Sequence, residues 1–101
     1  MELNNIWKTK FQRAPDCAFR EIEGETFIVS SSTGGVHLLN SVGSFIWNRL
    51  ELPATPEEIA GAVTDEFDVD SGTAQKDILD FFTSMIETSI VRQFESGESD
   101  G

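Results

Sequence analysis

The spacing of apolar residues changes from a strand period to a helix period near the middle of the chain. In residues 19–29, Phe27 and Val29 share one face by the two-residue period of a strand. A polar turn at 30–35 then precedes the apolar run Val36–Leu39, which predicts a further strand. Together these runs predict three short antiparallel strands. Three strands cannot close a barrel, so the predicted sheet keeps two edges.

Helical spacing follows the last of these strands. Asn40 predicts the N-cap of a first helix at 41–50. The run Thr55-Pro56-Glu57-Glu58 gives the second helix a threonine cap, proline at the first helical position and glutamate three residues after the cap. A third helix is expected from about residue 71 to about residue 88. The predicted fold is α+β, winged helix-turn-helix-like, with a three-stranded antiparallel sheet followed by three helices.

Length and composition predict one small domain. The chain has 101 residues, of which 39% are hydrophobic. We expect the domain at 18–92, an N-terminal arm at 1–17 and a disordered acidic tail at 93–101. No apolar run reaches the length of a membrane span, and the N-terminus lacks the apolar core of a signal peptide. The single cysteine, Cys17, allows no internal disulfide, which favours a cytoplasmic protein.

The net charge of −11 comes from the second half of the chain. Residues 51–101 hold two basic and thirteen acidic residues, and between residues 56 and 90 Lys76 is the only base. A helix that reads DNA needs several Lys or Arg side chains to neutralise phosphates. A winged-helix DNA-binding regulator is therefore disfavoured. A basic partner would be attracted to this half, although acidic surfaces often serve solubility alone.

Residues able to carry chemistry are scarce. His37 is the only histidine, and no carboxylate or cysteine stands at the spacing of a metal site. Cys17 has no neighbouring histidine to activate it. Gly34-Gly35 precedes a strand rather than a helix, so it is no phosphate-binding loop. We expect no catalytic residue, no metal and no cofactor, and we interpret the chain as a binding module rather than an enzyme.

Two surfaces are candidates for binding. Val36–Leu39 contains no proline and, apart from His37, no side chain that could carry a charge, so it suits an open sheet edge. Apolar residues of the third helix cover an arc of roughly 160°, whereas packing on one neighbour needs only about 100°. The helix is either buried centrally or lines a groove with Leu79 and Ile86, and with Lys76 and Thr83 at the rim.

The opposite edge of that helix remains an alternative. It carries Asp77, Phe81 and Ser84. Helical spacing gives the width of an apolar arc but leaves open which of its edges faces the groove.

A spaced signature spans the end of the third strand and the first helix: Leu39-Asn40, Val42-Gly43 and Ile46-Trp47. It resembles the LN-x-x-G-x-x-IW signature of the coenzyme PQQ synthesis protein D family. The likeness continues in three further stretches, at 55–60, 67–70 and 77–82. Two positions depart from the family pattern, because His37 replaces a frequent aromatic residue and Ser89 a frequent glycine. The first departure bears on the shape of the pocket beside the strand.

The resemblance implies a precursor-peptide recognition element. Such domains bind the leader of a ribosomally synthesised precursor peptide by strand addition beside the third helix. They then present it to a modifying enzyme, often a radical SAM enzyme. The peptide-binding residues predicted from this are Val36, His37, Leu38, Leu39, Lys76, Leu79, Thr83 and Ile86. The acidic half would favour leaders that carry Lys or Arg. A general adaptor that docks a larger enzyme is the alternative, and the open edges would also support a homodimer.

Overall fold

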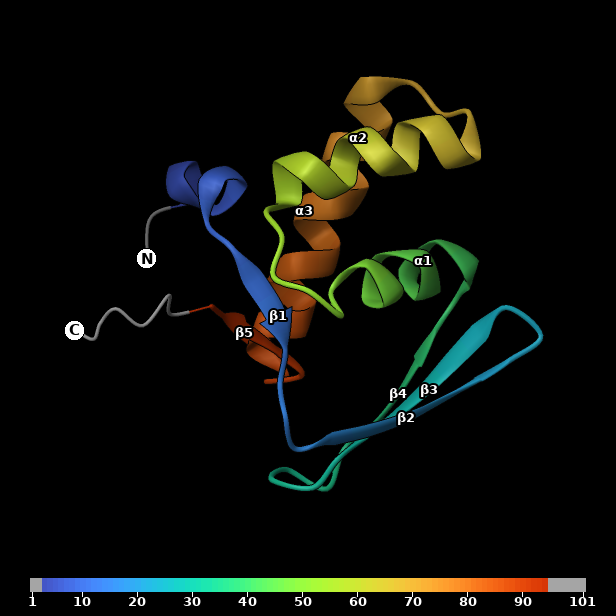
Figure 1. Cartoon of the computed structure of the whole chain (residues 1–101), viewed down its shortest axis with the longest axis vertical. Helices are drawn as coiled ribbons and strands as arrows, with labels where there is room; N and C mark the ends of the chain where they lie inside the picture. Colours follow the sequence, from blue (N-terminus) through green and yellow to red (C-terminus); the bar gives the residue numbers. More distant parts are fainter. Residues whose placement is uncertain (1–2, 95–101) are drawn as a thin grey trace.

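The computed structural model describes residues 3–94. Their elements, in chain order, are η1 (Leu3–Lys8), β1 (Phe11–Arg13), β2 (Cys17–Ile22), β3 (Glu25–Ser30), β4 (Val36–Leu39), α1 (Ser41–Arg49), α2 (Pro56–Phe67), α3 (Ser71–Glu87) and β5 (Val91–Gln93). Strands β2, β3 and β4 precede the three helices, which confirms the predicted α+β, winged-helix-like order (Figure 1).

The three-stranded sheet is antiparallel with the order β2-β3-β4. Along β3 the side chains of Thr26 and Ile28 are fully buried, whereas Phe27 and Val29 are 40% and 47% exposed. The sheet therefore has an inner face, against which α1 packs, and an outer face open to solvent. The two-residue period placed Phe27 and Val29 on a common face, and that face proves to be the outer one.

A second, two-stranded sheet joins the two ends of the chain. Strand β1 pairs antiparallel with β5, with Phe11 opposite Gln93 (Figure 1). Ile6 and Phe11 are both buried in the core. The sequence predicted only an arm at 1–17, without a strand in it. The described part of the expected arm therefore packs with the domain. Gln93, which was expected in the tail, pairs with β1 as well. Residues 95–101 lie outside the described residues.

The caps of the first two helices form as predicted. The Asn40 side-chain oxygen accepts a hydrogen bond from the Gly43 amide at 2.9 Å and caps α1. At α2, the Glu58 carboxylate accepts from the Thr55 amide at 3.0 Å, and the Thr55 hydroxyl accepts from the Glu58 amide at 3.1 Å. Local sequence decides these bonds because both partners lie within one helical turn.

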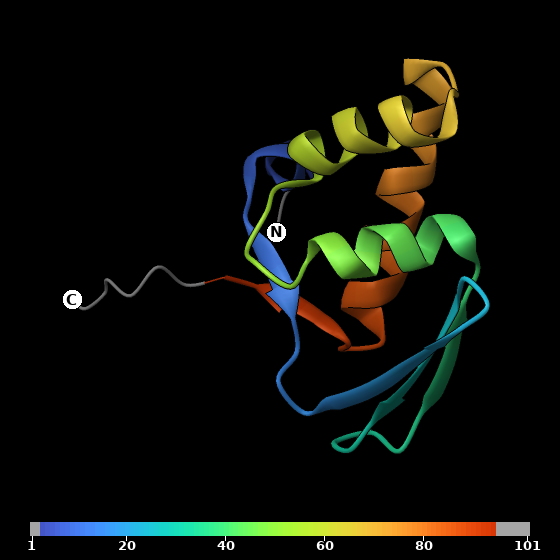
Figure 2. The same cartoon turned by 45° about the vertical axis from the view of Figure 1, so that its right-hand side comes forward.

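Helix α3 crosses the middle of the molecule, running past α2 and α1 toward β5 (Figure 2). Its residues Ile78 and Phe82 are completely buried, and the Phe82 ring lies 5.2 Å from the Phe11 ring between centroids. Burial in the centre of the molecule therefore explains why the middle of the apolar arc on α3 is apolar. None of the helices in residues 3–94 is both long enough and apolar enough to span a membrane.

Candidate functional site

Strand β4 is an edge of the sheet within the described residues, because it pairs with β3 on one side only. The Ser30 amide donates to the Gly35 carbonyl at 3.0 Å, which makes Gly35 a hydrogen-bonded position of this ladder. Bonded and non-bonded positions alternate in an antiparallel pair. The N–H and C=O groups of Val36 and Leu38 therefore point away from β3, toward the open edge.

Side chains on β4 alternate between the two faces of the sheet. Val36 and Leu38 are 67% and 58% exposed on the outer face. His37 is partly buried and Leu39 is buried, both on the inner face. The four residues predicted on this strand thus divide by role: two offer backbone groups to the edge, and two direct side chains inward.

A groove of about 450 Å³ lies between the end of β4, α1 and α3. Apolar side chains form much of its surface, with two carboxylates on the α3 side. Its lining residues are Leu38, Leu39, Asn40, Val42, Gly43, Ile46, Asp77, Asp80, Phe81, Ser84 and Met85.

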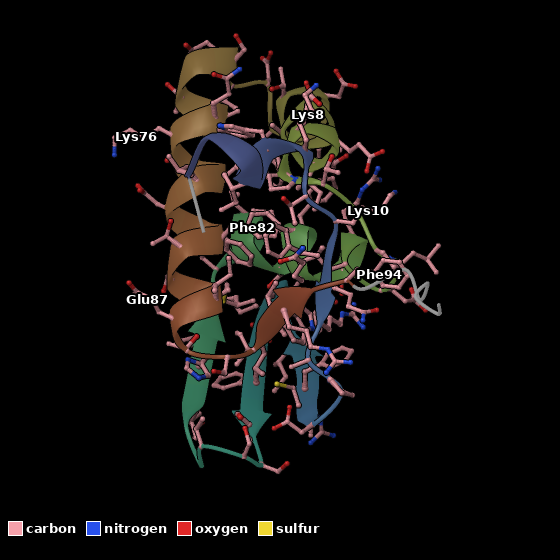
Figure 3. All side chains as sticks on the ribbon, turned by 90° about the vertical axis from the view of Figure 1, so that its left-hand side faces the viewer. Lys8, Lys10, Lys76, Phe82, Glu87 and Phe94 are labelled. Carbon is pink, nitrogen blue, oxygen red and sulfur yellow. The ribbon has the colours of Figure 1, made fainter. Side chains whose placement is uncertain are left out.

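Of the two edges of α3 considered from the sequence, the alternative one lines this groove. Lys76, Leu79, Thr83 and Ile86 do not line it, and the edge with Asp77, Phe81 and Ser84 does. Figure 3 shows Lys76 pointing away from the molecule, whereas Phe82 of the same helix points into it. Periodicity leaves the rotation of a helix about its axis undetermined, so the peptide-binding role of these four residues stays a prediction.

The four displaced residues have other surroundings. Thr83 is exposed, and Lys76 is exposed as well, forming an ion pair with Asp80 at 3.3 Å. Leu79 packs against the hydrophobic core. Ile86 lines a separate pocket beside β5. These contacts give none of the four a place in the groove.

Gly43 sets the floor of the groove. A Cβ atom at this position would stand 3.1 Å from the Cβ of Leu39 and 3.5 Å from Cε2 of Phe81. Because glycine has no Cβ, α1 can lie close to both the end of β4 and α3. The spaced signature thus has a structural meaning that sequence reasoning missed: its glycine occupies the point where three elements meet.

His37 presents a polar atom with an unmet hydrogen-bonding capacity. Its Nε2 atom is buried and has no hydrogen-bond partner among the described residues. Leaving a buried donor or acceptor unsatisfied costs about 1–3 kcal/mol. Since His37 lies on the inner face of the edge strand, a chain paired to β4 would bring side chains beside it.

The outer face of the sheet carries an uncovered patch of apolar side chains. Its large side chains, each 40% exposed or more, are Ile22, Phe27, Val29, Val36 and Leu38. Val29 stands opposite Val36, and Phe27 opposite Leu38, so four of them are adjacent across the strands. Exposed apolar patches of this kind mark interaction surfaces.

Two observations bear on reactive and metal-binding groups among residues 3–94. Burial, and then the neighbouring charge of Asp16, raise the pKa of the Cys17 thiol, which favours the less reactive protonated form. Among residues 3–94 no group of three or more His, Cys, Asp or Glu side chains could hold a metal ion. What the site offers is hydrogen-bonding backbone and apolar surface, with the carboxylates of Asp77 and Asp80 on the α3 side.

Comparison with known proteins agrees with this geometry. The structure "TbiB1 in Complex with the TbiA(beta) Leader Peptide" is similar with a TM-score of 0.75 and 28% identity, over 84% of this chain and 99% of that one. "Lasso peptide synthetase B1 complexed with the leader peptide" is similar in fold, with a TM-score of 0.71 and 23% identity, over 81% and 96% of the two chains. No curated protein sequence matches significantly. The model of the family described as coenzyme PQQ synthesis protein D matches residues 25–91, from the start of β3 into β5, and the chain therefore belongs to that family.

Proposed function

We propose that this protein binds the leader segment of a ribosomally synthesised precursor peptide and presents it to a modifying enzyme. The observation that carries the proposal is the open β4 edge, whose free backbone groups stand beside the groove. The likeness to TbiB1, which is described in complex with a leader peptide, supports it. The protein acts in this role by binding alone, without catalysing a reaction.

The mechanism is strand addition. An extended leader pairs with β4 and turns alternate side chains into the groove. Val36 and Leu38 each offer one N–H and one C=O, and at about 0.5–1.5 kcal/mol per bond these supply about 2–6 kcal/mol. Micromolar affinity needs about 8 kcal/mol. Since a fully buried apolar side chain adds about 1.5–3 kcal/mol, about two leader side chains must be buried in the groove.

Presentation to the enzyme uses the outer face of the sheet. A leader strand beside β4 would extend the sheet, and its outward side chains would lie next to Val36 and Leu38. An enzyme that docks on this enlarged apolar face would contact protein and leader together. The enzyme would thereby distinguish the loaded protein from the free one. A radical SAM enzyme is the partner that the family resemblance favours.

Hydrogen exchange at single amides tests the proposal. The full chain is mixed with synthetic N-terminal segments of any small peptides found encoded beside its gene. We expect slowed exchange at Val36 and Leu38, whose amides are free at the edge, and little change at His37, which already pairs with Ile28. Unchanged exchange at Val36 and Leu38 with a peptide that binds would exclude strand addition at this edge.

A general adaptor that docks a larger enzyme without a leader is the second candidate, favoured by the uncovered apolar outer face. The two functions differ in what the enzyme requires. An adaptor would bind the enzyme equally well with or without peptide. A recognition element would bind it more tightly once the leader occupies β4.

A further inference from the structure

The groove beside β4 combines an apolar floor with an acidic mouth. Leu39, Phe81 and Met85 belong to the floor, and Asp77 and Asp80 project from one side of α3. Among residues 3–94 no Lys or Arg lines the groove. A chain that lies in it would therefore meet negative but no positive side chains among the lining residues.

The direction of α3 places that charge relative to β4. Ile86 lies in a pocket with Ser32, in the loop before β4, whereas Phe81 approaches Gly43, just after β4. Helix α3 therefore runs opposite to β4. Asp77, one turn before Phe81, lies beyond the point where β4 joins α1.

We propose that the groove selects leaders in which an apolar residue is followed or preceded, two positions away, by Lys or Arg. The apolar side chain packs on Leu39 and Phe81, and the cation reaches Asp77 and Asp80. The two-position spacing follows from the strand period, because only alternate side chains of the added strand face inward. This inference rests on the proposed function and adds the chemistry of the leader to it.

Neither carboxylate is held in a strong ion pair that would keep it from such a cation. Asp77 forms no ion pair with any described residue, and Asp80 pairs only with Lys76. The side chains of Lys76 and Asp80 are 78% and 69% exposed, so this pair is weak. Because Asp77 and Asp80 are three residues apart on one helix, a single guanidinium could contact both.

Selection from a displayed library of randomised linear peptides tests the inference whatever the sequence of the natural leader. The full chain, the D77N/D80N variant and the control D65N/E66Q serve as baits. The control removes the same two charges from exposed positions on α2, away from the groove. We expect peptides selected by the full chain and by D65N/E66Q to be enriched in Lys or Arg two positions from an apolar residue. Peptides selected by D77N/D80N should lack this enrichment.

Titration of one selected peptide gives the magnitude. Its dissociation constant should rise about three- to tenfold in D77N/D80N, the range of one or two exposed ion pairs, and stay unchanged in D65N/E66Q. Added salt should weaken binding to the parent chain more than to D77N/D80N. Equal cation enrichment with all three baits, or none with the parent chain, would overturn the inference.

The same experiment separates this inference from the proposed function. If the selected peptides need an intact β4 edge but show no preference for Lys or Arg, the inference is wrong and the proposed leader binding is still supported. If the selected peptides bind Leu38→Pro as tightly as they bind the parent chain, both the inference and the proposed strand addition at β4 are wrong. A library that yields no binder at all would also count against both.

Discussion

The hydroxyl of Thr26 in β3 donates a hydrogen bond to the hydroxyl oxygen of Ser44 in α1 over 2.7 Å, and both side chains are buried. Ser44 in turn donates to the Leu39 carbonyl at 3.4 Å. This relay connects the central strand, the first helix and the end of β4. It therefore fixes α1 against the sheet at the floor of the proposed peptide groove.

Removing one partner of this pair should cost more than removing both. Ser44→Ala leaves the Thr26 hydroxyl buried without its acceptor, so the free energy of unfolding should fall by about 1–3 kcal/mol. Adding Thr26→Val, which replaces that hydroxyl by a methyl group, should recover part of the loss. Urea denaturation of the single and double variants measures both values. A double variant less stable than Ser44→Ala would contradict the account.

Proline on β4 should separate binding from folding. Val36→Pro and Leu38→Pro remove amides that point to the open edge, so peptide affinity should fall about tenfold or more while the fold survives. His37→Pro is the control, because it removes an amide that pairs with Ile28 and should destabilise the protein itself. Fluorescence titration and thermal unfolding of the three variants give the comparison. Unchanged affinity in both edge variants would rule out strand addition.

A bulky side chain should identify the helix edge that faces the peptide. Ser84 lines the groove and Thr83 does not, although both are exposed and adjacent on α3. Ser84→Trp should weaken peptide binding about tenfold or more by filling the groove, and Thr83→Trp should change it about twofold at most. The reverse order of effects would favour the helix edge with Leu79 and Ile86 instead.

Polar substitution of the outer face should impair modification more than peptide binding. In the V29S/V36S variant two facing apolar side chains are removed, while the backbone of the β4 edge is kept. Because Val36 would lie beside the leader's outward side chains, we expect peptide affinity to fall about fivefold at most. The rate of leader-dependent modification should fall about tenfold or more at saturating peptide. Leu52→Ser is the control, since Leu52 is 73% exposed elsewhere on the molecule. If the patch instead joins two copies, sedimentation will show a dimer that only V29S/V36S dissociates.

Acid should weaken the second helix through its capping box. The hydrogen bond from the Thr55 amide lowers the pKa of the Glu58 carboxyl. A lowered folded-state pKa stabilises the fold above the ordinary Glu pKa of about 4.3, and this stability is lost as the pH falls through the folded value. Thermal unfolding between about pH 5 and pH 2.5 should therefore show a smaller pH dependence in Glu58→Gln, which accepts the same bond without titrating. An identical pH dependence in both proteins would contradict this.

Features that depend on neighbours in the chain could be predicted from the sequence. The caps at Asn40 and Thr55 were predicted because both hydrogen-bond partners lie within one turn. The β4 edge was predicted because Val36–Leu39 carries neither a proline nor an acidic or lysine side chain to protect it. Strand β1 was missed, since three residues give too short a pattern and their partner β5 lies at the other end of the chain.

The sequence by itself determined the α+β order, the family signature and the concentration of negative charge in the second half. Only the tertiary structure decided which face of each element meets solvent. It turned Asp77, Phe81 and Ser84 toward the groove and left Val29 and Val36 uncovered. The physical reason is that periodicity fixes which side chains share a face. The direction of that face is set by packing against elements distant in the chain.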